Sequence, residues 1–186
     1  MPARKNLPDL ALGPEEAAAI LGVHWSRPSK MVDRGEIGAR ETSSNDDGSR
    51  VFRIFSLREC EEDYQRYLRL LSGQEEIGIV RRPRSRVDDR EPVYRVLSDA
   101  KLPQIVFGDA IGTYEAAAII GVWPTYVRRL VAQGRLIGRI AWSQRSGDSR
   151  MWIISRSSAE ELAAAMSREE KTGKHHGRPR TGPYSI

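Results

Sequence analysis

The residues of this sequence that are best suited to chemistry are arginines, hydroxyl groups and aromatic rings. Thr125, Tyr126, Arg128 and Arg129 lie together a few residues after Gly121. An arginine can hold guanine through the O6 and N7 atoms of the base, and Thr or Tyr suits a phosphate or a thymine methyl group. These residue types favour nucleic-acid recognition, although the same pattern is compatible with a solvated helix face.

Other kinds of chemistry find little support in the sequence. No phosphate loop, paired-cysteine motif or nucleophile elbow is present. The single cysteine, Cys60, cannot form a disulfide within the chain, and His24, His175 and His176 do not have the spacing of metal ligands. We therefore expect no enzymatic activity, no cofactor and no metal.

A helix is needed to position the group that runs from Thr125 to Arg129. Pro124 suits the first turn of such a helix, and Val127, Leu130 and Val131 form its apolar stripe. An Ala-rich helix precedes it and is expected to end at Gly121. Two short helices with a glycine at the corner are typical of a helix-turn-helix.

The same elements occur twice in the chain. Residues 12–23 recur as residues 111–122, with eight of twelve positions identical at an offset of 99. Gly35 then aligns with Gly134, and residues 49–52 align with residues 149–152 at an offset of 100. The shared order of helix, glycine, variable loop and aromatic strand indicates a duplication.

Each copy is predicted to contain two helices, a hairpin and a closing helix. In copy one, Pro14 begins the first helix after a Gly13 cap, and Gly22 ends it. Hairpin tips rich in turn formers lie at residues 42–49 and 143–149. Capping boxes open the closing helices at Ser56…Glu59 and Ser157…Glu160. The expected fold class is mainly α with small β-hairpins, an α+β protein.

The motifs at residues 16–23 and 115–122, the two glycines, and the Arg–x–aromatic strands at 50–52 and 150–152 resemble the winged-helix family of phage excisionases and MerR-type regulators. The resemblance covers about residues 10–72 and 109–167. It implies tandem winged helix-turn-helix domains whose second helices enter the major groove. The chain departs from the family in having two modules where an excisionase has one. It also lacks the long dimerisation helix and effector domain of a MerR-type regulator.

The predicted organisation has four segments: winged helix-turn-helix copies at 10–72 and 109–168, a connector at 73–108 and a basic flexible tail at 169–186. The connector is expected to be a solvated linker, with residues 93–97 and 104–107 each forming a short strand or helical turn. Its basic run at 81–86 is also compatible with a path along the minor groove. In copy one Pro28 falls inside the second helix, so that helix is expected to begin late, with Ser26 as its cap.

The predicted DNA contacts follow from this arrangement. In copy two they are the helix residues given above and the wing residues Arg139, Arg145 and Arg150. In copy one they are Trp25, Ser26, Arg27, Ser29 and Lys30 on the helix, and Arg50 and Arg53 on the wing. Arg178 and Arg180 of the tail resemble the core of an AT-hook. A charged hairpin without a ligand and a plain tail are the alternatives for the wing and tail residues.

Charge distinguishes the two copies. The chain has a net charge of +5; residues 1–72 hold 11 basic against 12 acidic side chains, and residues 109–186 hold 12 against 7. Because each neutralised phosphate adds affinity, copy two is expected to supply most of the electrostatic attraction to DNA. Copy one is either a weaker reader or a docking surface for a protein partner.

The expected function is a sequence-specific DNA-binding protein, a repressor-like transcriptional regulator that reads an asymmetric double-stranded site with its two heads, an arrangement that one monomer could provide. The alternatives are an architectural factor of the excisionase, recombination-directionality or packaging type, and a protein-interaction module with one residual DNA-binding head. The N-terminus lacks a signal peptide, and no apolar run approaches the roughly 20 residues that cross a bilayer. We therefore expect no membrane association and a cytoplasmic, nucleoid-associated location.

Overall fold

The computed structural model describes residues 8–43, 51–72, 90–99, 101–142 and 151–171. In these residues the first half contains β1 (Ala11–Leu12), α1 (Pro14–Leu21), α2 (Arg27–Asp33), β2 (Ala39–Ser43), β3 (Val51–Ser56), α3 (Leu57–Leu71) and α4 (Arg90–Leu97). The second half contains the 3-10 turn η2 (Phe107–Asp109), β4 (Ala110–Ile111), α5 (Thr113–Ile120), α6 (Pro124–Ala132), β5 (Gly138–Ile140), β6 (Trp152–Ser155) and α7 (Arg156–Lys171). The predicted α+β class is confirmed.

The two halves have matching antiparallel sheets. Their strand orders are β1-β3-β2 and β4-β6-β5. Leu12 pairs with Phe55, and Ile111 pairs with Ile154, so the offset of 99 also holds in the strands. The predicted match of Phe52 with Trp152 is therefore wrong, and the structural equivalent of Trp152 is Arg53. We call the two halves repeat one (β1 to α3) and repeat two (β4 to α7).

Local signals set the helix ends. Gly22 and Gly121 end α1 and α5 in the left-handed conformation, with φ of 66° and 76°. The hydroxyl of Ser56 accepts the Glu59 N–H at 3.1 Å and caps α3, as predicted.

The predicted cap of α7 is wrong. The hydroxyl of Ser155 accepts the Ser158 N–H at 3.1 Å, so the cap lies two residues before Ser157. The backbone N–H of Ser157 already lies in the first turn of the helix and donates to the Asp109 carboxylate at 2.8 Å.

The connector is structured over much of its second half. Val93 and Leu97 of α4 are buried in the core of repeat one, which confirms a helical turn there. Ala11 donates its N–H to the Ile105 carbonyl at 2.9 Å, so the chain also pairs with the edge of β1. The prediction of a solvated linker is wrong for these residues, because their apolar side chains cover the first repeat.

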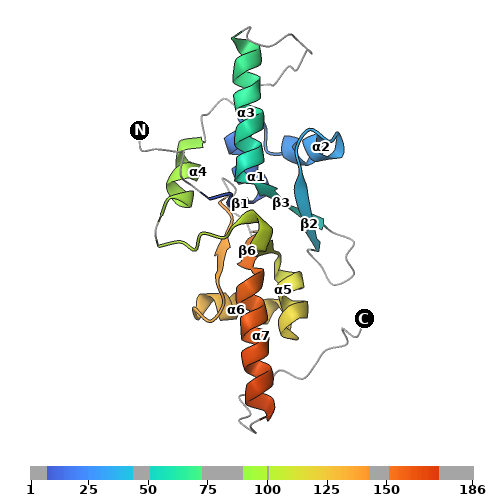
Figure 1. The fold of residues 1–186 in the computed structure, drawn as a ribbon, viewed down its shortest axis with the longest axis vertical. Coiled ribbons are helices and arrows are strands. Elements are labelled where there is room, and N and C mark those ends of the chain that lie inside the picture. Colours follow the sequence, from blue (N-terminus) through green and yellow to red (C-terminus); the bar gives the residue numbers. More distant parts are fainter. Residues whose placement is uncertain (1–7, 44–50, 73–89, 100, 143–150, 172–186) are drawn as a thin grey trace.

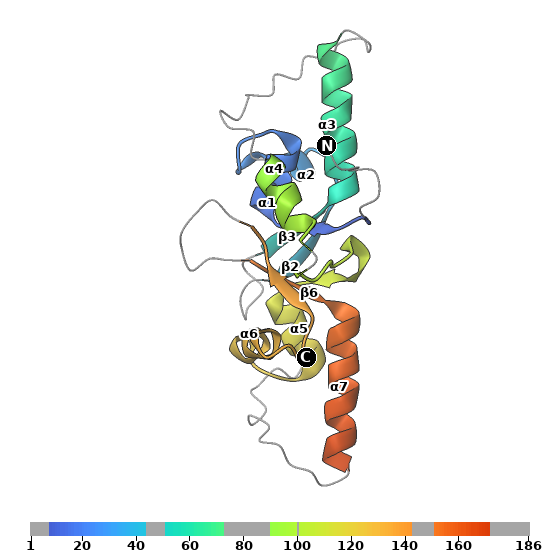
Figure 2. The same ribbon diagram turned by 90° about the vertical axis from the view of Figure 1, so that its left-hand side faces the viewer.

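The arrangement of the elements is elongated. Figure 1 shows α3 and α7 extending toward opposite ends of the long axis, with the two sheets between them. Figure 2 shows the same two helices along one edge of the molecule. One cluster of buried apolar residues joins the repeats where the sheets meet: Ala11, Ile54, Ile105, Ala110, Ala141, Met151 and Ile153.

Candidate nucleic-acid interface

Helix α6 presents a polar outer face and an apolar inner face. Val127 and Leu130 are completely buried. This fixes the rotation of the helix and leaves Thr125, Arg128 and Arg129 exposed, as the sequence predicts. Tyr126 is half-buried and packs against the core of repeat two, which makes it a supporting residue more than a surface contact.

The exposed face of α6 carries only positive charge. The helix contains no acidic residue, and Arg128 and Arg129 form no ion pair with any described residue. Arg135, just after Gly134, is also exposed and has no ion pair within the described part of the chain. Sequence reasoning missed Arg135, although a basic residue directly after a helix-ending glycine was visible.

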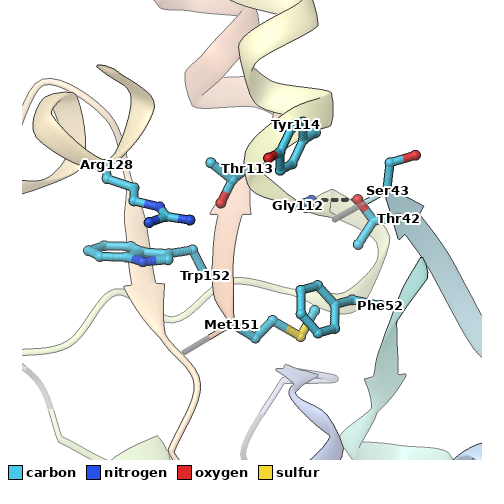
Figure 3. Close-up of a pocket in the computed structure, with 9 residues that line it drawn as sticks. All are labelled: Thr42, Ser43, Phe52, Gly112, Thr113, Tyr114, Arg128, Met151 and Trp152. Atoms are coloured by element: carbon cyan, nitrogen blue, oxygen red, sulfur yellow. Dashed lines mark hydrogen bonds between the residues drawn. The ribbon is translucent and has the colours of Figure 1, made fainter. Parts of the chain in front are cut away.

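Arg128 also borders a shallow pocket between the repeats. Figure 3 shows its side chain extending toward Trp152, with Phe52 of repeat one on the far side of the pocket. Trp152 is half-buried and packs against the core of repeat two. The lining is completed by Thr42, Ser43, Gly112, Thr113, Tyr114 and Met151.

Helix α2 stands at the equivalent place in repeat one. It begins at Arg27 with Ser26 before it, which confirms the predicted late start. The Ser26 hydroxyl does not cap the helix and lies 2.9 Å from Nδ1 of His24. Pro28 is buried in the first turn, where its missing N–H costs no hydrogen bond. Lys30 and Trp25 are exposed, and Arg27 and Ser29 are half-exposed.

Arg53 does not lie free on the wing. Its guanidinium lies 2.8 Å from the Asp33 carboxylate and 3.0 Å from Glu41, and it donates to the Ser29 carbonyl at 2.6 Å. The hydrogen bond to Asp33 raises the pKa of Arg53, although burial opposes this shift. The protein's own carboxylates therefore neutralise the charge that the prediction assigned to a DNA contact.

Arg139 lies inside the molecule and not on its surface. The prediction placed it on an exposed wing, but its side chain is only 4% exposed. Its two Nη atoms lie 2.6 and 3.0 Å from the oxygens of Glu16, and Nη2 also donates to the Ala11 carbonyl at 2.6 Å. The cause lies in repeat one, because the partner carboxylate is buried at the contact between the repeats.

Glu16 was missed by sequence reasoning and organises this contact. Besides Arg139, it accepts the backbone N–H groups of Gly13 and Trp142, each at 2.8 Å. A buried charge persists when its hydrogen-bonding capacity is filled in this way. The equivalent residue, Glu115, binds Arg40 at 2.5 Å and also pairs with Arg156. The available signal was the retention of both Glu and Arg at an offset of 99.

The other predicted sites fall outside the described residues. These are Arg50, Arg145, Arg150, Arg178 and Arg180. Among the residues that are described, no group of three or more His, Cys, Asp or Glu side chains is placed to hold a metal ion. Cys60 is buried in the core of repeat one, and this burial raises the pKa of its thiol.

Comparisons with known proteins add no assignment. No family model matches the chain, and searches of curated proteins and of solved structures find no match. Across the described residues no helix has both the length and the apolar character needed to cross a membrane.

Proposed function

We propose that this chain is a sequence-specific double-stranded DNA-binding protein made of two winged helix-turn-helix repeats, with α6 as its principal reading helix. The observation that carries the proposal is the exposed face of α6. Arg128, Arg129 and the adjoining Arg135 project from it without acidic neighbours on the helix. Such a face attracts phosphates and offers guanidinium groups to base edges.

Within this proposal the residues have separate roles. Thr125 lies at the N-terminal end of α6, the end that faces base edges when such a helix enters the major groove. Arg128 and Arg129 are one turn further along and can reach guanine or the flanking phosphates. Arg135 follows the helix and suits a phosphate contact. We assign the protein to the regulators of transcription as the most direct use of sequence-specific binding.

Repeat one is proposed to make the weaker DNA contact. Arg27 and Lys30 form no ion pair among the described residues, but Asp33 and Glu41 surround the nearby Arg53. Carboxylates at this place repel phosphates and reduce the attraction.

A second role for repeat one, docking a protein, is favoured by Trp25. Its side chain is 45% exposed beside His24, with a ring-centroid distance of 5.4 Å. Tryptophan is enriched among the residues that dominate protein interfaces.

The test begins with selection of the full chain against a random pool of double-stranded DNA. The selected duplex and a scrambled duplex are then titrated by fluorescence anisotropy at several salt concentrations. We expect Arg128→Ala/Arg129→Ala to weaken binding to the selected duplex by at least about tenfold, since a bidentate base contact is worth roughly 1–3 kcal/mol. The slope of log affinity against log salt is expected to fall by about one for each phosphate that an arginine no longer neutralises.

The matched control is Arg58→Ala/Arg168→Ala. These arginines are exposed on α3 and α7 and not on α6, and their removal lowers the net charge equally. The control is expected to retain affinity within about twofold, because distant surface charges are screened. Equal losses in both variants would reduce the effect to net charge and contradict the role of α6. Tight binding that does not distinguish selected from scrambled DNA would favour an architectural factor.

A further inference from the structure

The contacts between the two repeats are reciprocal. Glu16 of repeat one binds Arg139 of repeat two, and Glu115 of repeat two binds Arg40 of repeat one. Since positions 16 and 115, and positions 40 and 139, are equivalent at the offset of 99, this is one contact made twice. Each uses α1 or α5 of one repeat and the second strand of the other repeat's sheet.

A second pair of contacts repeats the pattern. A Cβ added at Gly13 would lie 2.5 Å from the Cβ of Ala141, and one added at Gly112 would lie 2.3 Å from the Thr42 hydroxyl. Gly112 also donates its N–H to that hydroxyl at 3.1 Å, as Figure 3 shows. Residues 13 and 112, and residues 42 and 141, are again equivalent. Both glycines are needed because a residue of the other repeat lies against each of them.

The residues between these contacts share one buried cluster with their own equivalents. Ala11 and Ala110 belong to the same buried cluster, and so do Ile54 and Ile153. A surface that contacts itself around a central line, with exchanged contacts on either side, is the mark of a two-fold axis. Figure 1 agrees, because a half-turn in the plane of the page brings α3 onto α7, and α2 from one side of the long axis to α6 on the other.

This symmetry is not what the order along the chain suggests. Tandem repeats follow one another head to tail in sequence, and repeats related by translation would read a direct repeat in DNA. Two-fold related heads match the dyad symmetry of the duplex, so their half-sites run in opposite directions. The orientation is fixed, because the Glu16–Arg139 pair is buried and bidentate and holds the backbone of both repeats.

We infer that the DNA recognised by this chain is an imperfect inverted repeat, read by one molecule whose fused repeats reproduce the symmetry of a homodimer. This inference rests on the proposed function. The two half-sites differ because α2 and α6 differ at the exposed positions, with Ser29 in place of Arg128 and Lys30 in place of Arg129. The stronger half-site belongs to α6.

The experiment uses the full chain and duplexes built from its selected motif. One duplex keeps both half-sites, a second reverses one half-site in place to give a direct repeat, and a third scrambles that half-site. Linked heads gain up to about 10²–10⁴-fold when both can engage, and nothing when geometry forbids it. We expect the reversed duplex to bind as weakly as the scrambled one, at least about tenfold below the parent duplex, at every spacing tested.

A symmetrised variant sharpens the test. Ser26→Thr/Ser29→Arg/Lys30→Arg/Asp33→Ala/Glu36→Arg gives repeat one the residues that stand at these equivalent positions of repeat two. Its stability is checked by thermal unfolding before binding is measured. We expect this variant, but not the parent chain, to bind a perfect palindrome of the α6 half-site at least about tenfold more tightly than the selected site. Each mismatched base pair typically lowers affinity by about fivefold or more.

The outcomes separate the two claims. A preference for the direct repeat, or a selected motif with a single half-site whose flanks do not matter, would overturn the inference and leave DNA binding intact. Absence of any selected sequence and of salt-sensitive binding would overturn the proposed function and the inference with it. An inverted motif whose affinity collapses on reversal of one half supports both.

Discussion

Helices α2 and α6 occupy equivalent places in the two repeats, yet the charges around their exposed faces differ. The acidic residues Asp33, Glu36 and Glu41 around α2 correspond to Ala132, Arg135 and Ile140 around α6. Both helices are held by the same buried positions, Met31 and Leu130 among them. Packing therefore fixes the position of each helix while its exposed face varies independently, so one repeat can carry a basic face while the other gains acidic neighbours.

The two ion pairs that join the repeats, Glu16–Arg139 and Glu115–Arg40, differ in burial. The side chains of Glu16 and Arg139 are 0% and 4% exposed, and those of Glu115 and Arg40 are 27% and 29% exposed. The chemistry is identical, but only the first pair is removed from water. Charge removed from water is costly to leave unpaired, whereas a solvated charge is little affected when its partner is removed.

The largest effect is therefore expected at the buried pair. Arg139→Met leaves the Glu16 carboxylate buried without its cation and should lower the free energy of unfolding by about 3–5 kcal/mol. Arg40→Met at the exposed pair should cost less than about 1 kcal/mol, since solvent screens Glu115 and Arg156 still pairs with it. Urea unfolding followed by circular dichroism measures both. Equal losses of unfolding free energy in the two variants would show that burial does not distinguish the two ion pairs.

The next effect separates the two helices that we propose to face DNA. Arg27→Ala/Lys30→Ala in α2 should weaken binding to the selected duplex by only about threefold, because the nearby carboxylates of Asp33 and Glu41 already offset the positive charge of this surface. The loss should be smaller than that of Arg128→Ala/Arg129→Ala, although both variants remove two positive charges. Anisotropy titrations at one fixed salt concentration compare them. A larger loss in the α2 variant would make repeat one the principal reader.

A smaller effect tests the caps of the closing helices. Ser155→Ala removes the hydroxyl that accepts the Ser158 N–H, and should cost about 1 kcal/mol of stability. Ser56→Ala should cost a similar amount at the equivalent cap in repeat one. Ser157→Ala is the comparison variant, since its hydroxyl contacts the Asp109 carboxylate and the Ser155 hydroxyl instead of capping a backbone N–H of α7. Thermal unfolding of the three variants would contradict the assignment if Ser157→Ala were the most damaging.

The smallest effect concerns Cys60, whose equivalent in repeat two is Ala159. Burial raises the thiol pKa in the folded chain, so the unfolded chain loses its proton first as pH rises. Stability is fully present below the unfolded value, about 8.5, and falls above it; the loss from pH 7 to pH 9 should stay below about 1 kcal/mol. Cys60→Ala should remove this dependence. An unchanged pH profile in the variant would mean that the thiol contributes nothing to it.

Much of the local structure could be predicted from the sequence, because it depends on neighbours in the chain. The glycines that end α1 and α5, the proline that opens α6 and the spacing of Val127 and Leu130 all act within a few residues. These signals determined two equivalent helix pairs and the outward face of α6. The duplication itself was visible as identical residues at a constant offset.

Only the tertiary structure decided which arginines are available to a partner and how the repeats are related. Arg139 carries no local mark of burial, since its partner Glu16 lies more than a hundred residues away in the sequence. Arg53 is held by Asp33 and Glu41, which come from a helix and another strand. The two-fold relation of the repeats also depends on contacts between distant segments. The sequence indicates which face of each segment is buried or exposed. The partner of each side chain depends on how distant segments pack together.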